Sequence, residues 1–185
     1  KPESGEGAVR GFAADMGDAA SVDGFLDSVL ADGPVDILVN NVGASPSRNF
    51  LYMSDDDWTA LFELNLMSAV RCTRRLLPGM RSRKWGRVVM VSSGAALYPN
   101  AALIDYAATK AAMVATGKAL ARKYGPDNVL VNLVLPGLIH TSMWERAAGE
   151  VAEANKTTSE AVLAANARSV PVGRYGTSDE VAALI

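Results

Sequence analysis

Strand-like apolar runs alternate with helix-like segments along this chain, and this alternation constrains the fold more than any other feature. Strands are expected at Ala8–Ala14, Val35–Val39, Arg87–Val91 and Val129–Leu135. Three of the four runs are nearly continuous in β-branched and aliphatic residues, which is typical of strands covered on both faces. Strands and helices in alternation predict a parallel, doubly wound α/β sheet.

The segments between the strands carry helix start and stop signals. Ser21 and Ser54 each precede a helical stretch, and three aspartates after Ser54 suit the positive end of a helix dipole. A long helix is therefore expected over Ser54–Arg83. Another is expected over Ile104–Tyr124, because a Gly-Pro pair follows as a stop signal.

Length and charge narrow the class of protein. The 185 residues suit one domain with a sizeable core. The 18 basic and 20 acidic residues are well mixed, so a nucleic-acid partner is not expected. No apolar run approaches membrane-spanning length, so a membrane is not expected as a partner either. Cys72 is the single cysteine, which rules out an intrachain disulfide and fits a cytoplasmic location.

Small, polar or glycine residues follow each expected strand. They are Asp15-Met16, the stretch NNVG at Asn40–Gly43, Ser92-Ser93-Gly94, and PGLIHT at Pro136–Thr141. Ligands of doubly wound sheets bind beyond the carboxyl ends of the strands. Four such loops together predict a ligand crevice at this edge, although polar loops are also common where no ligand binds.

A serine, a tyrosine and a lysine are the candidates for chemistry in that crevice. Tyr106 and Lys110 are four residues apart on an expected helix and share one face, and Ser93 follows the third strand. A free phenol has a pKa near ~10. An ammonium about 5 Å away contributes roughly 3 kcal/mol at an effective dielectric of ~20, which lowers that pKa by about two units. The trio therefore indicates proton exchange with an alcohol or carbonyl oxygen, and the alternative is a surface tyrosine over a lysine stem.

These motifs, in this order and spacing, resemble the short-chain dehydrogenase/reductase family in its form with a catalytic Asn-Ser-Tyr-Lys tetrad. The NNVG stretch is similar to the family's Asn-Asn-Ala-Gly turn, with Val42 in place of alanine. Asn65, in ELNLMSAV, falls at the tetrad asparagine. AADM and PGLIHT resemble the strand end that meets the adenine ring and the Pro-Gly turn followed by a threonine. The resemblance covers Ala8 to Ile185.

The resemblance implies an enzyme that transfers a hydride between NAD or NADP and its substrate, with Tyr106 as general acid or base. The implied catalytic residues are Asn65, Ser93, Tyr106 and Lys110. In the family, the serine positions the substrate oxygen and the asparagine holds a water in a proton relay. The implied cofactor-binding residues are Asp15, Met16, Asn40, Gly43, Tyr106, Lys110, Ile139 and Thr141. No metal is expected, and the only histidine is His140.

Residues 142–170 occupy the place of the family's mobile substrate lid, with a short helix expected over Ser159–Ala167. The residues expected to line the substrate pocket are Gly94, Ala95, Leu103, Ile104 and Trp144. They are small or apolar, which favours a small neutral ketone, a secondary alcohol or a 3-oxoacyl substrate. For Trp144, ordinary core packing is an equal alternative. Arg48 is either an anion-binding residue or a solvated side chain, and the solvated interpretation is favoured.

Parts of the family's fold do not appear in the chain. The first two strands with their glycine-rich turn, and the last strand, are absent, so the resemblance implies a partial Rossmann-like domain over 1–185. The choice between NAD and NADP depends on an absent segment. In the family's sheet, two absent strands would separate Ala8–Ala14 from Val35–Val39, leaving an empty slot in the core. We therefore expect the native polypeptide to extend beyond residues 1 and 185.

Two alternatives to an active oxidoreductase remain, a catalytically silent cofactor-binding or interaction module and a truncated, inactive fragment. The intact Asn-Ser-Tyr-Lys set argues against the silent module. The resemblance also implies a homodimer or homotetramer that pairs through the helices expected at Ser54–Arg83 and Tyr106–Tyr124.

Overall fold

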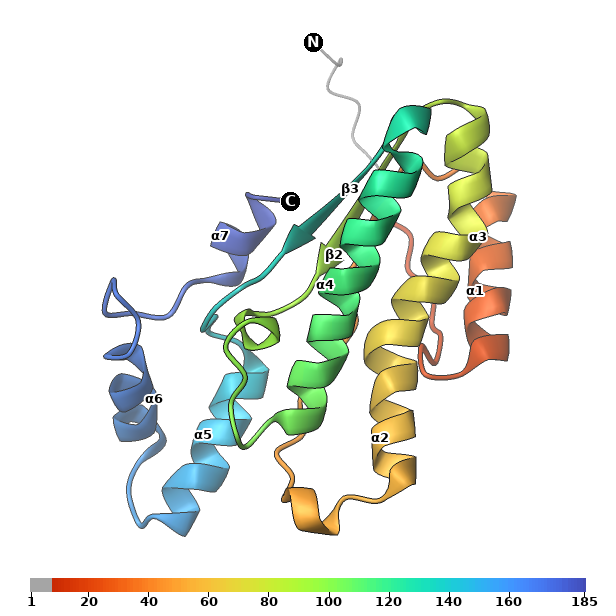
Figure 1. The fold of residues 1–185 in the computed structure, drawn as a ribbon. Coiled ribbons are helices and arrows are strands. Elements are labelled where there is room, and N and C mark those ends of the chain that lie inside the picture. The colour runs from red at the N-terminus through yellow and green to blue at the C-terminus, as the bar shows by residue number, and fades with distance from the viewer. Residues whose placement is uncertain (1–7) are drawn as a thin grey trace.

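The computed structural model describes residues 8–185, which fold around a three-stranded parallel sheet (Figure 1). The strands are β1 (Ile37–Asn40), β2 (Gly86–Val91) and β3 (Val129–Val134), in the spatial order β1-β2-β3. Both pairs of neighbouring strands are parallel. In their register Ile37 lies beside Arg87, and Arg87 lies beside Leu130. The predicted parallel α/β sheet is confirmed, and three of the four expected strands form it.

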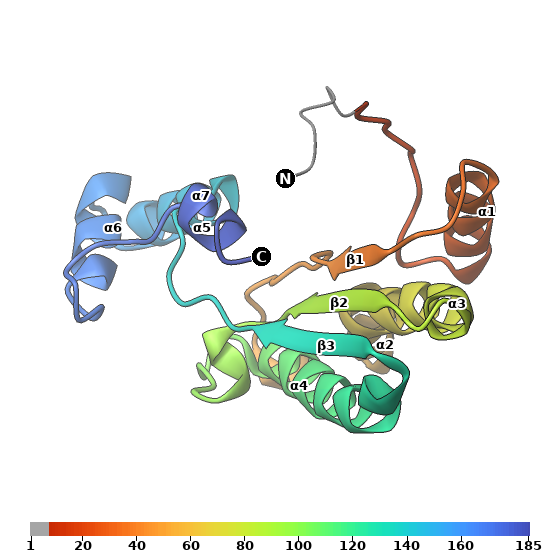
Figure 2. The same cartoon turned by 90° about the horizontal axis from the view of Figure 1, so that it is seen from above.

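One face of the sheet is covered by the central helices of the chain (Figure 2). These are α2 (Asp55–Phe62), α3 (Ser68–Ser82) and α4 (Ile104–Tyr124), while α1 (Ala19–Ala31) packs against α3. A π-helical turn, Glu63–Met67, joins α2 to α3, so the long predicted helix is interrupted rather than uniform. The core lies between this helical layer and the strands. Its most buried members are Val22, Leu26, Met80, Val88, Met90, Met113 and Val129.

Two of the three helix starts expected from the sequence are confirmed, and one differs. The helix α4 spans the predicted Ile104–Tyr124. Ser54 caps α2 in a reciprocal pair with Asp57, as its sequence signal predicts. The prediction that Ser21 begins the first helix is wrong, because Asp18 accepts the Ser21 amide and starts α1 earlier.

The expected strand at Ala8–Ala14 does not form, and that prediction is wrong. Residues 8–15 lie in irregular backbone with no ladder partner among the described residues. An apolar run becomes a strand only where a neighbouring strand supplies partners for its amides and carbonyls. Propensity alone therefore does not decide this segment.

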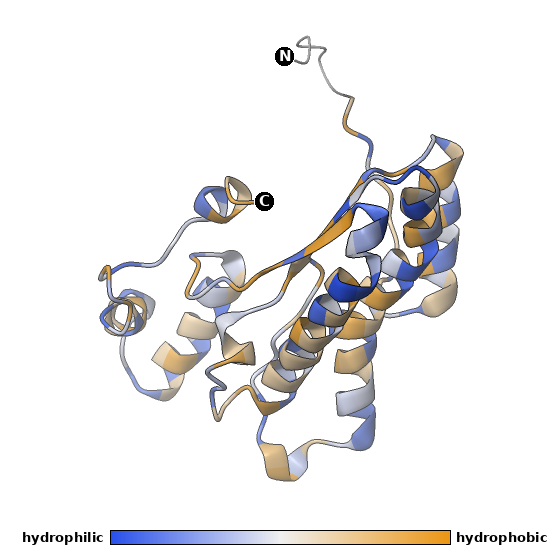
Figure 3. Cartoon of the chain, turned by 45° about the horizontal axis from the view of Figure 1, so that its top comes forward, coloured by the Kyte–Doolittle hydropathy of each residue, from blue (hydrophilic) through white to orange (hydrophobic). Residues whose placement is uncertain are grey.

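Within residues 8–185 the second face of the sheet is open along β1 and β3, contrary to the expectation that both faces are covered, while Val89 and Val91 of the central strand are buried. Ile37 is 58% exposed, and Val39 and Leu130 are 41% and 42% exposed. Figure 3 shows apolar residues along the strands and mixed polarity along the helices. The strands therefore have the composition of a sheet with two covered faces, although the described helices cover one.

The remaining helices lie beyond the carboxyl ends of the strands rather than over the open face (Figure 2). They are α5 (Ser142–Ala154), α6 (Ser159–Ala167) and α7 (Ser178–Ala182), and the predicted bounds of α6 are confirmed. A parallel bridge joins Ile139 to Gly176, so the chain that leaves β3 returns beside its own starting point. Among residues 8–185, no helix is both long and apolar enough to cross a bilayer.

Candidate active site

The loops after β2 and β3 are tied together at the carboxyl edge of the sheet. The Ser92 amide donates to the Val134 carbonyl at 2.8 Å, and the Gly94 amide donates to the Pro136 carbonyl at 2.9 Å. Ser93 lies between these two bonds and caps a short 3₁₀ turn, Gly94–Ala96. The parallel register therefore continues past the strand ends and fixes the serine there.

The helix α4 brings Tyr106 and Lys110 to the same edge. The Lys110 Nζ donates to the Val91 carbonyl at 3.0 Å and lies 5.7 Å from the centre of the Tyr106 ring. The Ser92 hydroxyl donates to the Lys110 carbonyl at 2.9 Å, which fixes the helix against the end of β2. Because residues four apart share one helix face, the predicted juxtaposition of phenol and ammonium is present.

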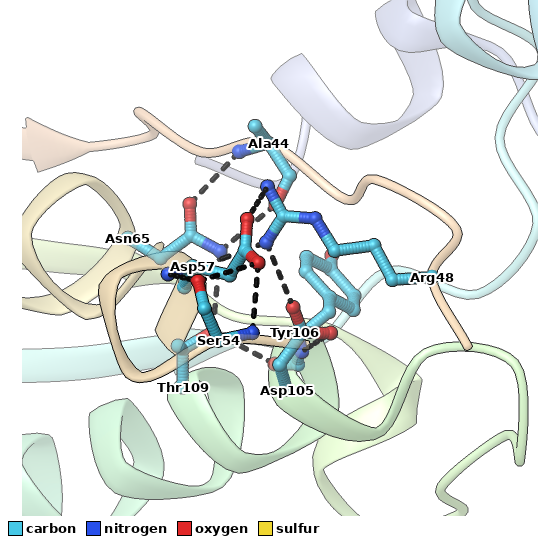
Figure 4. Close-up of polar contacts among 8 residues, drawn as sticks. All are labelled: Ala44, Arg48, Ser54, Asp57, Asn65, Asp105, Tyr106 and Thr109. Atoms are coloured by element: carbon cyan, nitrogen blue, oxygen red, sulfur yellow. Dashed lines mark hydrogen bonds and ion pairs between the residues drawn. The ribbon is translucent and has the colours of Figure 1, made fainter. Parts of the chain in front are cut away.

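Asn65 lies in the π-helical turn and is completely buried. Its Oδ1 accepts the Ala44 amide at 2.8 Å, and its Nδ2 donates to the Ala44 carbonyl at 2.9 Å and to Thr109 Oγ1 at 3.1 Å (Figure 4). The side chain therefore connects the loop after β1 to α4, one residue before Lys110. Thr109 and Ala44 were missed from the sequence, and only their adjacency to Lys110 and Gly43 could have suggested them.

Gly43 packs directly against the polar side chains of this site. A Cβ at Gly43 would lie 3.2 Å from Lys110 Nζ and 3.3 Å from Asn65 Oδ1. These separations are tight for a carbon, so the absence of a side chain here lets the loop approach both groups. The glycine of the NNVG stretch thus has a packing reason.

Burial shifts the pKa of both ionisable groups of the trio. Burial raises the pKa of the Tyr106 phenol, and the hydrogen bonding of Ser93 partly opposes that rise. Burial also lowers the pKa of Lys110 from 10.5 to about 8. The expected lowering of the Tyr106 pKa by Lys110 is therefore not present here, because desolvation of the phenol is the larger effect.

The residues expected to bind a cofactor differ in whether their side chains already have hydrogen-bond partners within the protein. The Asn40 side chain donates to Thr73 in the core at 3.1 Å, so it points away from the crevice. Asp15 accepts the Gly17 amide and remains exposed, beside the half-buried Met16. The Thr141 side chain makes no capping bond to α5, whereas its carbonyl accepts the Glu145 amide at 3.1 Å.

Ile139 leaves its own backbone groups unused by the bridge to Gly176. The bridge bonds run from the His140 amide to the Gly176 carbonyl and from the Gly176 amide to the Leu138 carbonyl. In a parallel bridge the residue between these two points its own amide and carbonyl to the other side. The expectation that Ile139 offers backbone to a ligand therefore remains open.

The residues expected to line a substrate pocket come from three elements. The Ala95 amide donates to Ser93 Oγ at 3.1 Å, so Ala95 and Gly94 lie next to the serine. Leu103 and Ile104 stand at the start of α4. Trp144 belongs to α5 and packs edge-to-face on Tyr175 at 5.8 Å between ring centres. Its lining of a pocket stays a prediction.

The expectation that Arg48 is solvated is wrong. Its guanidinium pairs with Asp57 and with the buried Asp105, which precedes Tyr106. His140 is exposed and lies 3.8 Å from Glu145. Among residues 8–185, no group of His, Cys, Asp and Glu side chains gathers as metal ligands do.

Comparison with known proteins places this geometry among relatives. The family model described as short chain dehydrogenase matches residues 2–152. The 3-oxoacyl-acyl-carrier-protein reductase FabG of Salmonella typhimurium is 32% identical over 177 residues, which cover 95% of this chain and 68% of the relative.

Two solved structures share the fold. The L-sorbose reductase of Gluconobacter frateurii, crystallised with NADPH and L-sorbose, has a TM-score of 0.87 at 35% identity over 92% of this chain and 65% of that one. An NAD⁺-bound xylitol dehydrogenase has a TM-score of 0.84 at 26% identity over 94% of this chain and 69% of that one. The chain thus spans about two thirds of the length of the proteins it matches.

Proposed function

The chain belongs to the short-chain dehydrogenase family, and on that premise we propose that its protein interconverts a ketone and a secondary alcohol with a nicotinamide cofactor. Tyr106 is the general acid or base, Ser93 holds the substrate oxygen, and Lys110 supplies positive charge. The substrate is small and neutral, or a 3-oxoacyl group like that named for the Salmonella relative.

The burial of Lys110 beside Tyr106 is the observation that carries this proposal. The residue is 3% exposed, yet no carboxylate pairs with it in the described part of the chain. A protein gains no stability by burying an unpaired ammonium. Perturbed ionisable groups that converge at the carboxyl edge of a parallel sheet are typical of an active site.

The raised pKa of Tyr106 suits the reduction direction. A phenol that stays protonated at neutral pH donates its proton to the oxygen formed from a carbonyl. Ser93 lies on the same edge and lowers the phenol pKa by hydrogen bonding, so both hydroxyl groups reach one substrate oxygen. For the reverse reaction, the hydrogen bonding of Ser93 favours the phenolate.

The site fits a nicotinamide cofactor in three respects. The Lys110 ammonium can donate three hydrogen bonds. Among residues 8–185 it donates one, to the Val91 carbonyl, so two remain for ribose hydroxyls. Gly43 lets its loop lie directly against Lys110 and Asn65, and the bridge to Gly176 leaves the amide and carbonyl of Ile139 unused. When bound, the cofactor supplies or accepts the hydride. NADPH in the sorbose reductase and NAD⁺ in the xylitol dehydrogenase leave both forms as candidates.

Asn65 has a supporting role in the proposal. Its Oδ1 and the Lys110 ammonium face the same space beside Gly43. A carboxamide oxygen accepts two hydrogen bonds, and the Ala44 amide supplies one. A water held by the second connects the ammonium to solvent and replaces protons that Tyr106 gives up.

Two further proposals concern the rest of the molecule. Residues 142–170 act as a lid over the substrate, with Trp144 on its inner side. A groove of about 370 Å³ between α3 and α4 is lined largely by apolar side chains such as Val70, Leu77 and Leu120. We assign this face to self-association as a homodimer or homotetramer, which sedimentation of the full-length protein tests.

The proposed function is tested by cofactor oxidation. The full-length protein is mixed with NADH or NADPH and a panel of small ketones and 3-oxoacyl thioesters, and the absorbance of the reduced cofactor is followed. We expect one combination to give a kcat on the order of 1–10 s⁻¹. Absence of turnover across the panel, with the cofactor shown to bind, would instead indicate a silent cofactor-binding module.

A further inference from the structure

Arg48 connects its own loop to the starts of two helices, one of them 57 residues further along the chain (Figure 4). Its Nη1 lies 3.3 Å from Asp105 Oδ2 and 3.4 Å from the Asp57 carbonyl oxygen, and its Nη2 lies 3.4 Å from Asp57 Oδ1. Arg48 belongs to the loop after β1, Asp57 to the first turn of α2, and Asp105 to the first turn of α4. One guanidinium therefore holds a loop and two helix N-termini together.

Asp105 passes the position of Arg48 to the backbone of Tyr106. The Asp105 side chain is 2% exposed, and Arg48 is the one cation that pairs with it among residues 8–185. Its other oxygen, Oδ1, accepts the Tyr106 amide at 2.8 Å. Since a buried carboxylate needs its partner, a shift of the guanidinium moves the turn that carries the phenol.

The loop that carries Arg48 also borders the candidate site. Ala44 is bound to Asn65 through both its backbone groups. The Ser45 hydroxyl lies 3.0 Å from the sulfur of Met143 in α5. The loop is thus fixed at residues 44 and 48, and between them it reaches toward the segment proposed as a lid.

We propose that Arg48 is a positioning residue, which together with Asp105 holds the first turn of α4, and with it Tyr106, against the loop 41–49. The inference rests on the proposed function, in which Tyr106 exchanges the proton. A planar guanidinium reaches two carboxylates at once, whereas a lysine ammonium is a compact point charge. The arginine is therefore specific to this arrangement.

Three variants separate positioning from stability in the full-length protein. Arg48→Met leaves the Asp105 carboxylate unpaired and should lower Tm by roughly 10 °C. The double variant Arg48→Met/Asp105→Asn leaves no unpaired buried carboxylate at residue 105, so its Tm should return to within about 3 °C of wild type. Arg75→Met is the matched control, because Arg75 makes an exposed pair with Asp27 at 2.7 Å and its loss should leave Tm and kcat unchanged.

The kinetics of the double variant decide the proposal. We expect kcat to stay at least about 30-fold below wild type, with the dissociation constant of the cofactor unchanged, because the fold is restored but the phenol is misplaced. The kcat of Arg48→Lys, which keeps the positive charge, should lie between that of wild type and that of the double variant. If kcat of the double variant recovers along with its Tm, Arg48 is merely structural and the proposal is overturned.

A second readout does not depend on turnover. In the double variant, amide hydrogen exchange over residues 104–110 should be at least about 10-fold faster than in wild type, while residues 112–124 keep their protection. If residues 104–110 of the double variant exchange at the wild-type rate, the positioning role of Arg48 is overturned, even where no substrate is known. A wild-type protein that turns over no substrate refutes the proposed function, and the exchange result then still decides whether Arg48 positions Tyr106.

Discussion

The ammonium of Lys110 donates a hydrogen bond to the carbonyl oxygen of Val91, the last residue of β2, at 3.0 Å. The helix α4 therefore holds a positive charge against the end of a strand, in a place that solvent scarcely reaches. Unfolding experiments measure what the burial of Lys110 costs in stability, and kinetic experiments measure what the site contributes to activity.

Lys110→Met should make the fold more stable at pH 7. Burial lowers the pKa of Lys110 from 10.5 to about 8, a penalty of about 3 kcal/mol, and the lost bond to Val91 offsets about 1 kcal/mol. Denaturant unfolding should therefore show a gain of about 2 kcal/mol. Lys118→Met, at an exposed position of the same helix, is the control and should change little.

The gain from Lys110→Met should also depend on pH. Between pH 8 and 10.5 the unfolded wild-type chain binds more protons than the folded one, so wild-type stability gains from rising pH while the variant does not. The difference between them should narrow across that interval. Titration of Cys72, whose thiol pKa is raised by burial, affects both proteins equally. A pH-independent difference would show that Lys110 is not desolvated.

Tyr106→Phe should leave the fold and cofactor binding intact while removing turnover. The substitution deletes only the phenol oxygen, so we expect Tm within about 3 °C of wild type and kcat at least about 1,000-fold lower. Tyr52→Phe, which changes a side chain of a residue that is 84% exposed, is the control. Turnover within about tenfold of wild type would reject Tyr106 as the proton donor.

Gly43→Ala should lower kcat. The added methyl group would lie 3.2 Å from Lys110 Nζ and 3.3 Å from Asn65 Oδ1, so the ammonium must move by a few tenths of an ångström. We expect kcat to fall by about tenfold. Gly24→Ala is the control, because nothing lies within 4 Å of its added Cβ in α1, and it should raise stability by about 0.5–1 kcal/mol. Unchanged kcat in Gly43→Ala would mean that this contact has no bearing on the reaction.

Asn65→Ala should destabilise the protein by about 2–4 kcal/mol in urea unfolding, because the change leaves both backbone groups of Ala44 and the Thr109 hydroxyl without this partner. Asn155→Ala removes an exposed side chain that bonds the Val151 carbonyl at the end of α5, and should cost less than about 1 kcal/mol. Equal losses in the two variants would contradict the role of Asn65 in joining loop and helix.

The parts of the fold that depend on local signals were predictable. The helix α4 ends at the predicted residue because the Gly-Pro stop signal follows it directly in the sequence. Ser54 was found as a cap because the three aspartates that follow it suit the positive end of a helix dipole. The strand expected at Ala8–Ala14 failed because it needs a neighbour that the run itself does not specify.

In the candidate site, too, the features set by local spacing were predictable and those set by tertiary contacts were not. Tyr106 and Lys110 share a helix face by spacing alone, and Ser93 follows a strand that ends at the same edge. The pairing of Arg48 with Asp105 was not predictable, because the two are distant in sequence and meet only when the loop folds onto α4. The shift in the Tyr106 pKa likewise depends on burial, which no spacing reveals.

The bridge between Ile139 and Gly176 has a consequence for how such a protein can diversify. It brings the two ends of the intervening segment together, so that segment is anchored at its base whatever its length. Because closing a longer loop adds little entropic cost, residues can be inserted or deleted there without disturbing the sheet. Under the proposed function, selection for a larger or smaller substrate can thus act on α5 and α6 while Ser93, Tyr106 and Lys110 keep their positions.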